Sequence, residues 1–393
     1  MDFTVWLGLA LASAAIWVSI ALTMKTKSEK LWPKLSFTFL ILSIVFLVVG
    51  VIQIFRGSQM NNQIAESTAL IETEVIVSPE YTGNSDMESK EDYSEAESYA
   101  KLADESRKNG EYEKALRLCK SAMDLDSDNA YIYNCRGAVY KDLQDDDNAL
   151  ADFIKATEID SNYWLAYYNS GLIYHDRQDY ESAINYFTKA IDSNPNYGRA
   201  YYGRGIEYSE IKQYGSAIED FTKVLALDSP NSFAHNNRGN AYYFLGEYDK
   251  AIQDYKAAID LNTYNECAHN NLMICYKKQG NHYFNSEDYE LAIQSFTSFL
   301  ELDPNNAEYY CKRGIAYHYL NKYDKALDDY STAIEYDPKS ARSYYNRSIT
   351  YYVCEDYEDA LTDIDKALFI EPDNEKYIDL RAKVIELING TGS

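Results

Sequence analysis

The sequence is short of the residues on which several protein classes depend. Its 393 residues include only 6 Cys, 7 Pro and 17 Gly, too few for a disulfide-stapled scaffold, a proline-rich segment or a collagen-like repeat. Positive charge is also scarce, with 37 Lys and Arg against 62 Asp and Glu and a formal net charge of -25. Because phosphate backbones bind clustered Lys and Arg, we expect no nucleic-acid partner. The 46% of hydrophobic residues still suffice for substantial cores, which excludes a wholly disordered chain.

Sequence motifs of reactive chemistry are missing as well. The chain contains no GxxxxGKS/T, HExxH, GxSxG or CxxC, which are patterns of phosphate-binding loops, zinc peptidases, serine hydrolases and thiol redox sites. The 5 His are scattered along the chain, which indicates packing or surface roles. We therefore expect no enzyme, no catalytic residue, no metal site and no cofactor. Whether any cysteines pair, for instance Cys275 with Cys311, is left open by the sequence.

Two apolar segments distinguish the N-terminal region from the rest. Residues 3–24 and 35–55 are each long enough to cross a bilayer as a helix, which takes about 20 residues. The residues between them, 25–34, include four lysines. This pattern predicts a transmembrane hairpin over residues 1–56, a membrane anchor. A cleaved signal peptide is the alternative for the first segment, but no Lys or Arg precedes its apolar run and the run is too long.

The lysine-rich turn also indicates a topology. Because Lys and Arg beside a span resist translocation, we expect the turn 25–34 in the cytoplasm, and the N-terminus and everything after the second span on the extracytoplasmic side. Residues 57–93 are polar and acidic and lack the periodicity of the remaining chain. We interpret them as a tether.

From residue 96 onward one pattern returns every 34 residues. When each unit is numbered from 1 to 34, position 8 is small, positions 11 and 17 are mostly Tyr, position 20 is Ala and position 24 is mostly aromatic. Apolar residues at helical spacing, followed by a break near position 32, predict two amphipathic helices per unit. The recurring alanines are Ala115, Ala149, Ala183, Ala217, Ala251, Ala292, Ala326 and Ala360.

This pattern resembles the tetratricopeptide repeat family, whose signature has a small residue at position 8, Tyr at 11, Ala at 20, an aromatic residue at 24 and Pro at 32. The resemblance implies an all-α fold, a right-handed superhelical solenoid of helix-turn-helix repeats, here preceded by the two transmembrane helices. We place eight repeats within residues 94–374, a capping box of Ser94 and Glu97 at their start, and a C-terminal capping helix at 375–389. The repeats start at residues 96, 130, 164, 198, 232, 273, 307 and 341.

The step from the fifth to the sixth repeat is seven residues longer than the others. We assign the extra residues to 266–272. Since seven residues make about two helical turns, we expect one long first helix in the sixth repeat, with its packed face almost unrotated. A short separate turn is the alternative.

Two charged positions change together when the eight repeats are compared. Position 7 is Arg and position 23 is Asp in repeats two, four, five, seven and eight, whereas the other three repeats have neither residue. The simplest cause is an Arg–carboxylate bridge between the two helices of one repeat; contact of the Arg with a ligand is the alternative. The expected pairs are Arg136 with Asp152, Arg204 with Asp220, Arg238 with Asp254, Arg313 with Asp329, and Arg347 with Asp363.

The resemblance also implies a binding surface. In the family the first helices line a concave groove through positions 2, 5, 9, 12 and 13, and this groove commonly holds an extended peptide or a partner helix. Five residues of repeats six to eight partly reproduce a family pattern that grips a peptide's C-terminal carboxylate, while many of the tyrosines could instead fill gaps between helices. The groove residues assigned in this way are Tyr131, Asn134, Tyr168, Tyr202, Asn236, Asn240, Tyr243, Lys277, Asn281, Lys312, Arg342 and Tyr345. The partial carboxylate pattern consists of Lys277, Asn281, Lys312, Arg342 and Asn346.

Together these features predict a membrane-anchored scaffold for protein–protein interactions. Its expected partners are other proteins or peptides and, through the hairpin, the membrane. The alternative is a non-catalytic accessory or regulatory subunit of a membrane-bound enzyme or of a secretion or assembly complex. Gly8 and Ala12 in the first span offer a small-xxx-small face for such a role.

Overall fold

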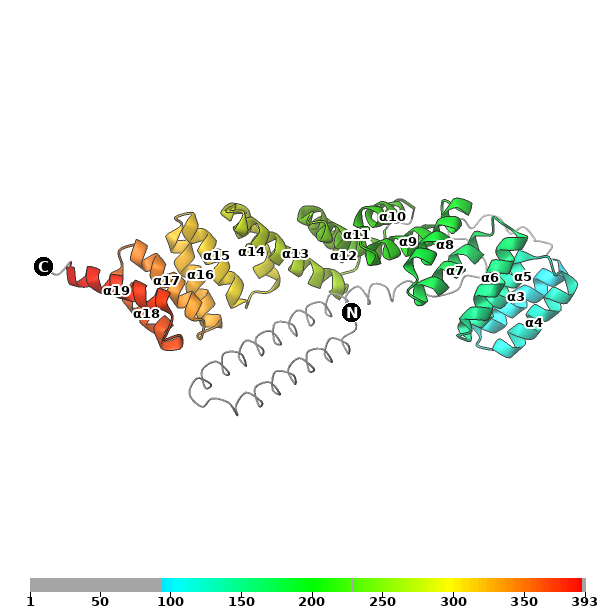
Figure 1. The fold of residues 1–393 in the computed structure, drawn as a ribbon, viewed down its shortest axis with the longest axis horizontal. Coiled ribbons are helices and arrows are strands. Elements are labelled where there is room, and N and C mark those ends of the chain that lie inside the picture. Colours follow the sequence, from blue (N-terminus) through cyan, green and yellow to red (C-terminus); the bar gives the residue numbers. More distant parts are fainter. Residues whose placement is uncertain (1–93, 228–229, 391–393) are drawn as a thin grey trace, which may run out of the picture. The chain divides into compact units, whose positions relative to one another are not determined.

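The computed structural model describes residues 94–227 and 230–390. Within these ranges 17 α-helices follow one another along the chain and no strand is present (Figure 1), so the predicted all-α fold is confirmed for this part of the chain. The predicted transmembrane helices at 3–24 and 35–55 and the tether at 57–93 lie outside the described residues. Among the described helices, none is both long and apolar enough to cross a membrane.

Consecutive helices pair as hairpins, and each hairpin packs against the next one in chain order (Figure 1). We refer to the eight hairpins as repeats one to eight, each with a first and a second helix. The first helices are α3 (Glu95–Lys108), α5 (Ala130–Asp142), α7 (Trp164–Asp176), α9 (Gly198–Glu210), α11 (Ser232–Phe244), α13 (Glu266–Asn285), α15 (Ala307–Tyr319) and α17 (Ala341–Val353). The second helices are α4 (Tyr112–Leu125), α6 (Asp146–Ile159), α8 (Tyr180–Ser193), α10 (Tyr214–Leu227), α12 (Tyr248–Leu261), α14 (Tyr289–Leu302), α16 (Tyr323–Tyr336) and α18 (Tyr357–Ile370).

Both ends of the array have the features expected of them. Ser94 and Glu97 form the predicted capping box, in which each side chain accepts a hydrogen bond of 3.2 Å from the other residue's backbone N–H. At the other end α19 (Glu375–Gly390) packs on α18 and buries Tyr377 and Val384. A terminal helix of this kind shields the apolar face that the last repeat would otherwise leave open.

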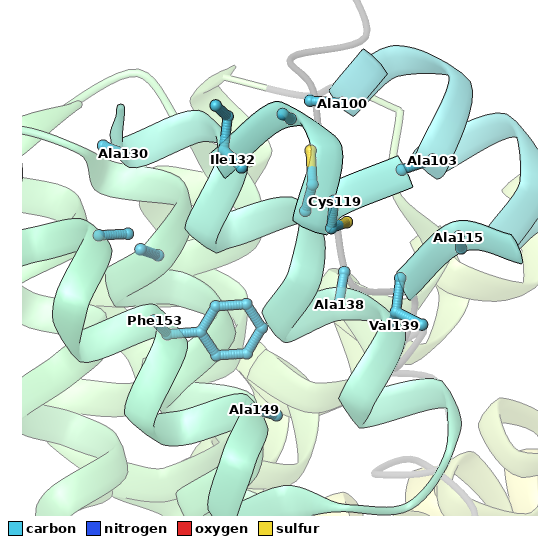
Figure 2. Close-up of a cluster of buried hydrophobic side chains, with 14 of the residues drawn as sticks. Ala100, Ala103, Ala115, Cys119, Ala130, Ile132, Ala138, Val139, Ala149 and Phe153 are labelled. Carbon is cyan, nitrogen blue, oxygen red and sulfur yellow. The ribbon is translucent and has the colours of Figure 1, made fainter. Parts of the chain in front are cut away.

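The core combines small and large side chains at fixed positions of the repeat. Ala at position 20 is completely buried in all eight repeats. Position 24 is buried as well, and Figure 2 shows it in the first two repeats, where Cys119 and Phe153 lie among alanines of neighbouring helices. Small residues on one helix leave the volume that a ring on the next helix fills, which keeps the interior close-packed.

A residue in the left-handed backbone conformation follows the first helix of every repeat and directs the chain into the second helix. Position 15 has a positive φ in all eight repeats, although Gly occupies it only at Gly110 and Gly246. In repeat two, for example, Gln144 has φ 61, and the next N–H, of Asp145, donates to the carbonyl of Tyr140 at 2.8 Å. This is the hydrogen bond of a Schellman ending, so the chain reverses within three residues.

The first helix of repeat six is a single long helix, as predicted. α13 has 20 residues, whereas α11 has 13. Its start is capped by Asn265, whose side chain accepts a hydrogen bond of 3.0 Å from the Ala268 N–H. The longer step between repeats is therefore absorbed within one helix, without a separate turn.

The two ends of α13 follow different registers. Near its start Asn271 donates to Asn236 of repeat five, 35 residues away, the same separation that joins two Asn side chains of repeats two and three. Near its end Asn281 accepts from Lys312 of repeat seven, 31 residues away, and this separation also joins Asn271 to Asn240. When α13 is aligned with the first helix of repeat five, its two extra turns thus lie at its C-terminal end. When α13 is aligned with the first helix of repeat seven, they lie at its start, residues 266–272. Successive repeats are offset here by about 10 Å along the helix.

Candidate functional site

The structure brings each of the five Arg and Asp pairs together. In every pair the guanidinium donates two hydrogen bonds to the carboxylate, from Nε and Nη2, at 2.6 to 2.8 Å. The carboxylates are buried between the two helices of the repeat. Burial raises the pKa of Asp152, Asp220 and Asp329, even though the paired guanidinium acts in the opposite direction. The cost of burying the charges therefore offsets part of the attraction between them.

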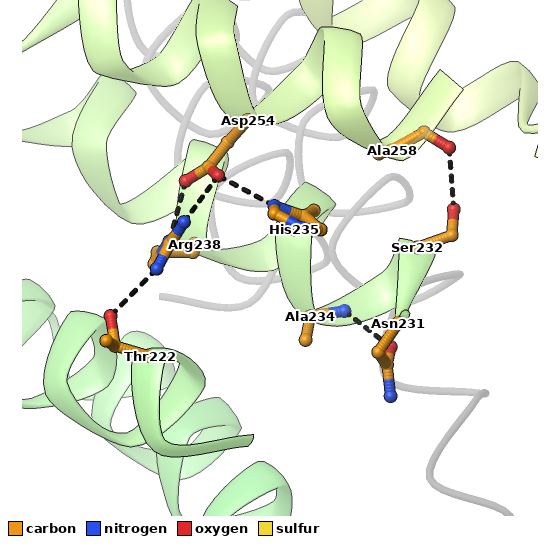
Figure 3. A network of polar contacts seen from close by, with 8 residues as sticks. All are labelled: Thr222, Asn231, Ser232, Ala234, His235, Arg238, Asp254 and Ala258. Carbon is orange, nitrogen blue, oxygen red and sulfur yellow. Dashed lines mark hydrogen bonds and ion pairs between the residues drawn. The ribbon is translucent and has the colours of Figure 1, made fainter. Parts of the chain in front are cut away.

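Most of these bridges extend to the preceding repeat. Figure 3 shows Arg238 donating to Asp254 within repeat five and, from Nη1, to Thr222 of repeat four at 3.0 Å. The same atom of three other Arg residues donates to a hydroxyl at position 25 of the repeat before, and those hydroxyls belong to Thr188, Thr297 and Ser331. Sequence reasoning missed this contact, although the hydroxyl at position 25 was a readable signal.

Repeats without the charged pair have other residues at positions 7 and 23. In repeat six, Ser295 donates to Gln279 at 2.9 Å across positions 23 and 7, and Gln279 donates to Asp249 of repeat five at 2.7 Å. A neutral pair thus keeps both the link within the repeat and the link to its neighbour. In repeat one the two positions are Leu102 and Leu118.

Seven of the 39 tyrosines lie beside the Arg side chains of these bridges. The guanidinium of Arg136 lies 5.7 Å from the ring centroid of Tyr133 and 5.9 Å from that of Tyr140, at positions 4 and 11 of its own helix. Arg204, Arg313 and Arg347 lie over tyrosine rings in the same way. These contacts are cation–π interactions that hold the Arg in place.

Three residues assigned to the groove are buried, and the prediction that they line an open surface is wrong. Asn134 accepts a hydrogen bond from Asn169, Asn236 accepts one from Asn271, and Tyr168 packs edge-on against Tyr197. All three occupy position 5, whose side chain meets the first helix of the next repeat. The hydroxyl of Tyr202, at the same position but half-buried, accepts a hydrogen bond from Asn237.

The other groove residues keep part of their surface. Each is half-buried, except Arg342, which is exposed. They lie on the first helices of repeat two and of repeats five to eight, and all but Tyr131 belong to four consecutive repeats. They are Tyr131, Asn240, Tyr243, Lys277, Asn281, Lys312, Arg342 and Tyr345.

A cluster of cations stands on this face in repeats six to eight. Lys312 donates to Asn281 at 3.1 Å and lies over the Tyr309 ring, 4.5 Å from its centroid, and Lys277 lies 5.2 Å from the same centroid. The Lys312 Nζ atom also pairs with Glu308 at 2.8 Å. We call Lys277, Lys312 and Arg342 the cation cluster.

The carboxylate of Glu308 sits in the field of the whole cation cluster. Its hydrogen bond with Lys312 lowers its pKa, and the charges of Lys277 and Arg342 act in the same direction. Sequence reasoning missed Glu308, although its spacing of four residues from Lys312 was a signal of an ion pair. Asn346, the fifth residue of the partial carboxylate pattern, instead donates to the Cys311 sulfur at 3.4 Å.

The cysteines form no reactive site in the described residues. None of the six takes part in a disulfide, so the pairing of Cys275 with Cys311 does not occur. Burial raises the pKa of Cys119 and of Cys275 to about 12, which keeps both thiols protonated and unreactive near neutral pH. Among residues 94–227 and 230–390, no group of His, Cys, Asp and Glu side chains is arranged to hold a metal ion.

Three solved structures to which the chain is similar illustrate the comparison. MamA is 26% identical, with 42% of this chain and 90% of that chain covered and a TM-score of 0.39. A tetratricopeptide repeat protein from Parabacteroides merdae is 19% identical (65% and 98% covered, TM-score 0.37), and YrrB, described as a TPR protein with an unusual peptide-binding site, is 23% identical (58% and 97%, TM-score 0.27). With TM-scores this low, none of the three carries an argument about function. No curated protein matches the sequence.

Models of the repeat family match most of the array. The model described as "Tetratricopeptide repeat" matches residues 164–197, 232–265 and 307–340, and a second model of the same description matches 130–163 and 198–231. A third, "TPR repeat", matches 103–144 and 280–320. The residues between 266 and 279, where α13 carries its two registers, fall outside every match. The chain therefore contains tetratricopeptide repeats, and the helix hairpins of the described array are their structural form.

Proposed function

We propose that the face of the first helices binds an anionic segment of a partner protein at the cation cluster, and that the chain acts as a protein–protein interaction scaffold. The observation that carries this proposal is the position of Glu308. Its carboxylate pairs with Lys312 and also feels the charges of Lys277 and Arg342, so cations of three consecutive repeats act on it. A carboxylate supplied by a partner, at its C-terminus or on an acidic side chain, would find the same donors.

The internal carboxylate can be displaced. The Glu308 side chain is 64% exposed, whereas Lys312 is 20% exposed and is held by Asn281 and the Tyr309 ring. Lys312 is therefore the fixed part of the site and Glu308 is the movable part. In a chain with a net charge of -25, a local positive field of this kind selects the anionic end of a partner and orients it.

The scaffold is further proposed to be anchored in a membrane. The two apolar segments, 3–24 and 35–55, and the lysine-rich turn between them support an anchor with its turn in the cytoplasm. The repeats would then lie on the extracytoplasmic side and present their binding face beside the membrane.

Removing the cations should weaken binding of acidic peptides. We expect Lys277→Ala with Lys312→Ala to reduce the affinity for a peptide with a free acidic C-terminus by about 10- to 100-fold, because each charge-assisted hydrogen bond is worth about 1.5–3 kcal/mol. Glu308→Gln should raise the affinity by about fivefold, because two like charges about 4 Å apart repel by about 1 kcal/mol in water and the substitution removes one of them. Fluorescence anisotropy with the full chain in detergent measures both effects.

The control variant is Lys325→Ala, which removes a cation of α16 that lies over Tyr317. It should leave peptide affinity unchanged. Amidation of the peptide C-terminus, with acidic side chains retained, separates recognition of the terminal carboxylate from recognition of a side chain. Equal affinities of the unsubstituted protein and the double Lys variant would disprove the proposed site.

The proposed topology predicts which part of the chain a protease reaches. Protease added to intact cells, or to spheroplasts where an outer envelope is present, should digest the repeats while a cytoplasmic marker stays whole. An epitope tag after Ser393 reports the digestion by immunoblot. Protection of the tag until the membrane is permeabilised would place the repeats in the cytoplasm and reverse the topology.

A further inference from the structure

A completely buried carboxylate lies between the first helices of repeats three and four. Glu207 on α9 is 0% exposed, and its Oε1 atom accepts a hydrogen bond of 2.5 Å from Nδ1 of His175 on α7. Its other oxygen, Oε2, is also buried and has no hydrogen-bond partner within the described residues. The imidazole is therefore the group that compensates this buried charge. We call the two residues the His–Glu pair.

The two preceding contacts between first helices have a permanent cation at the position of His175. Position 12 of repeats one and two is Arg107 and Lys141, and these side chains pair with Asp142 and Asp176 at position 13 of the next repeat. In repeat three, position 12 is His175, and its partner lies at position 10 of the next repeat, about one helical turn earlier. Arg and Lys stay charged near neutral pH, whereas His titrates there. The third contact in the series is thus the first that can lose its positive charge.

Two carboxylates near this end of α7 have cations of their own. Asp176 of α7 pairs with Lys141 of α5, and Asp147 of α6 pairs with Arg177 of α7. Both α5 and α6 pack against α7. The cations that these helices bring to the region are therefore bound to carboxylates other than that of Glu207.

The other two helices packed against α7 bring a second carboxylate and a phenol. Glu210 follows Glu207 on α9 by three residues, and its charge acts on His175 as well. On α8, burial and the charges of Glu210 and Glu207 raise the pKa of the Tyr180 phenol, so this group stays neutral near pH 7. The imidazole thus lies in the field of several carboxylates, which favours its protonated form.

The pH response of this contact follows from the charges. Burial acts to lower the pKa of His175, but the bond to Glu207 and the charges of Glu207, Asp176 and Glu210 raise it above its ordinary value of 6.5. Because the pKa is higher in the folded than in the unfolded chain, the stabilisation is complete below about pH 6.5 and is lost as the pH rises through the folded pKa. Above that pH the buried carboxylate faces a neutral imidazole, and a buried charge without a counter-charge is destabilising.

A second His at position 12 has a different partner. His318 of repeat seven faces position 10 of repeat eight, where its Nδ1 atom lies 2.8 Å from the hydroxyl oxygen of Thr350. Burial lowers the pKa of His318. The stabilisation of this contact is therefore present above about pH 6.5 and is lost as the pH falls. The chain thus contains two equivalent contacts that respond to pH in opposite directions.

We propose that the His–Glu pair makes the contact between repeats three and four a pH-sensitive joint, closed when His175 is protonated and loosened when it is neutral. Each repeat of such an array contacts only its neighbours. Loosening one contact therefore lets repeats one to three move relative to repeats four to eight and leaves the packing within each group intact. This proposal depends neither on the cation cluster nor on the membrane anchor.

The first test measures the charge of the imidazole. Hydrogen exchange at the C2 atom of each His, followed by mass spectrometry of the full chain in detergent, gives the pKa of His175 and of His318 separately. We expect the pKa of His175 to lie above 6.5 and that of His318 below it. Glu207→Gln keeps the shape of the side chain and should lower the pKa of His175 by about one unit or more. A pKa of His175 at or below 6.5 in the unsubstituted protein would overturn the proposal.

The second test measures opening of the joint by backbone amide exchange at pH 5.5 and 8.0, with each rate divided by that of the unfolded peptide at the same pH. Protection of α7 and α9 should fall at pH 8.0 by up to about tenfold for each unit by which the pKa of His175 is raised. Protection of α15 and α17 should not fall. His175→Lys reproduces Lys141 of repeat two and should keep α7 and α9 equally protected at both pH values.

Three further results would disprove the joint. Equal protection of α7 and α9 at pH 5.5 and 8.0 in the unsubstituted protein would mean that the pair does not control opening. An equal loss in α15 and α17 would assign the response to the net charge of the whole chain. A pH response that persists in His175→Lys would assign it to another titrating group.

Discussion

Replacing Gly137 with Ala is expected to destabilise the array by about 2–3 kcal/mol, because overpacking a dense core costs about that much. A Cβ atom at Gly137 would lie 2.6 Å from Cε1 and 2.8 Å from Cδ1 of Phe153, and 3.1 Å from the Ala149 carbonyl oxygen. Phe153 is completely buried and cannot swing away. Denaturant unfolding followed by circular dichroism measures the loss as a lower midpoint.

Gly215→Ala is the control for this substitution. Gly215 lies in α10, and a Cβ atom there meets nothing within 4 Å. Because Ala favours a helix over Gly by up to about 1 kcal/mol, this variant should be as stable as the unsubstituted protein or more so. A similar loss at both glycines would contradict the clash.

Repeat one suggests a compensating change. There position 8 is Ala103 and position 24 is Cys119, a larger residue facing a smaller one. Gly137→Ala combined with Phe153→Cys copies that pair into repeat two. The combined loss of stability should be smaller than the sum of the single losses by about 1–3 kcal/mol, since contacting residues couple by that amount. Additive losses would show that the two positions do not compete for one volume.

Removing Asp254 is expected to destabilise the array by about 3 kcal/mol, the range for breaking one partner of a buried ion pair. Asp254→Ala leaves the Arg238 guanidinium, 19% exposed, without its two carboxylate bonds, and it also removes the acceptor of the His235 ring. The measurement is the same unfolding midpoint. Asp254→Asn should be destabilising as well, because it keeps the shape and loses the charge.

The control replaces both partners. Arg238→Leu with Asp254→Leu reproduces positions 7 and 23 of repeat one, Leu102 and Leu118. Since buried ion pairs exchanged for apolar residues are often close to neutral, the double variant should stay within about 1 kcal/mol of the unsubstituted protein. A double variant as unstable as Asp254→Ala would show that the bridge itself stabilises the array.

Local features of the repeat could be predicted from the sequence because the eight repeats pack in the same way, so that corresponding residues can be compared between them. The joint presence of Arg and Asp at positions 7 and 23 predicted the contact found between Arg238 and Asp254. Two residues that form an ion pair are expected to occur together in a repeat or to be replaced together. The same reasoning missed Thr222, because its partner lies in the following repeat and the comparison was made within single units. Residues 1–93, with the predicted anchor, lie outside the described structure, so that prediction is untested.

The candidate site was harder to predict than the fold. Whether a side chain at position 5 is open or buried depends on how closely neighbouring first helices approach, and that distance is set by packing between repeats. The prediction that Asn134 and Asn236 lie on the surface is therefore wrong, since both are buried between the first helices of consecutive repeats. Glu308 was missed for a different reason: an exposed Glu on a helix looks like any solvated charge until the cations around it are located.

The two registers of α13 also limit how an array of this kind can change in length over evolution. Seven residues turn an ideal helix by about 700°, which leaves the packed face only about 20° from its old direction. One residue more or fewer would rotate everything after it by about 100° and point Gly280 away from Phe296, where it now gives room to the ring. Insertions within a first helix are thus tolerated when they add two complete turns. Each such insertion shifts the binding face of the later repeats along the helix axis and leaves its side chains unchanged.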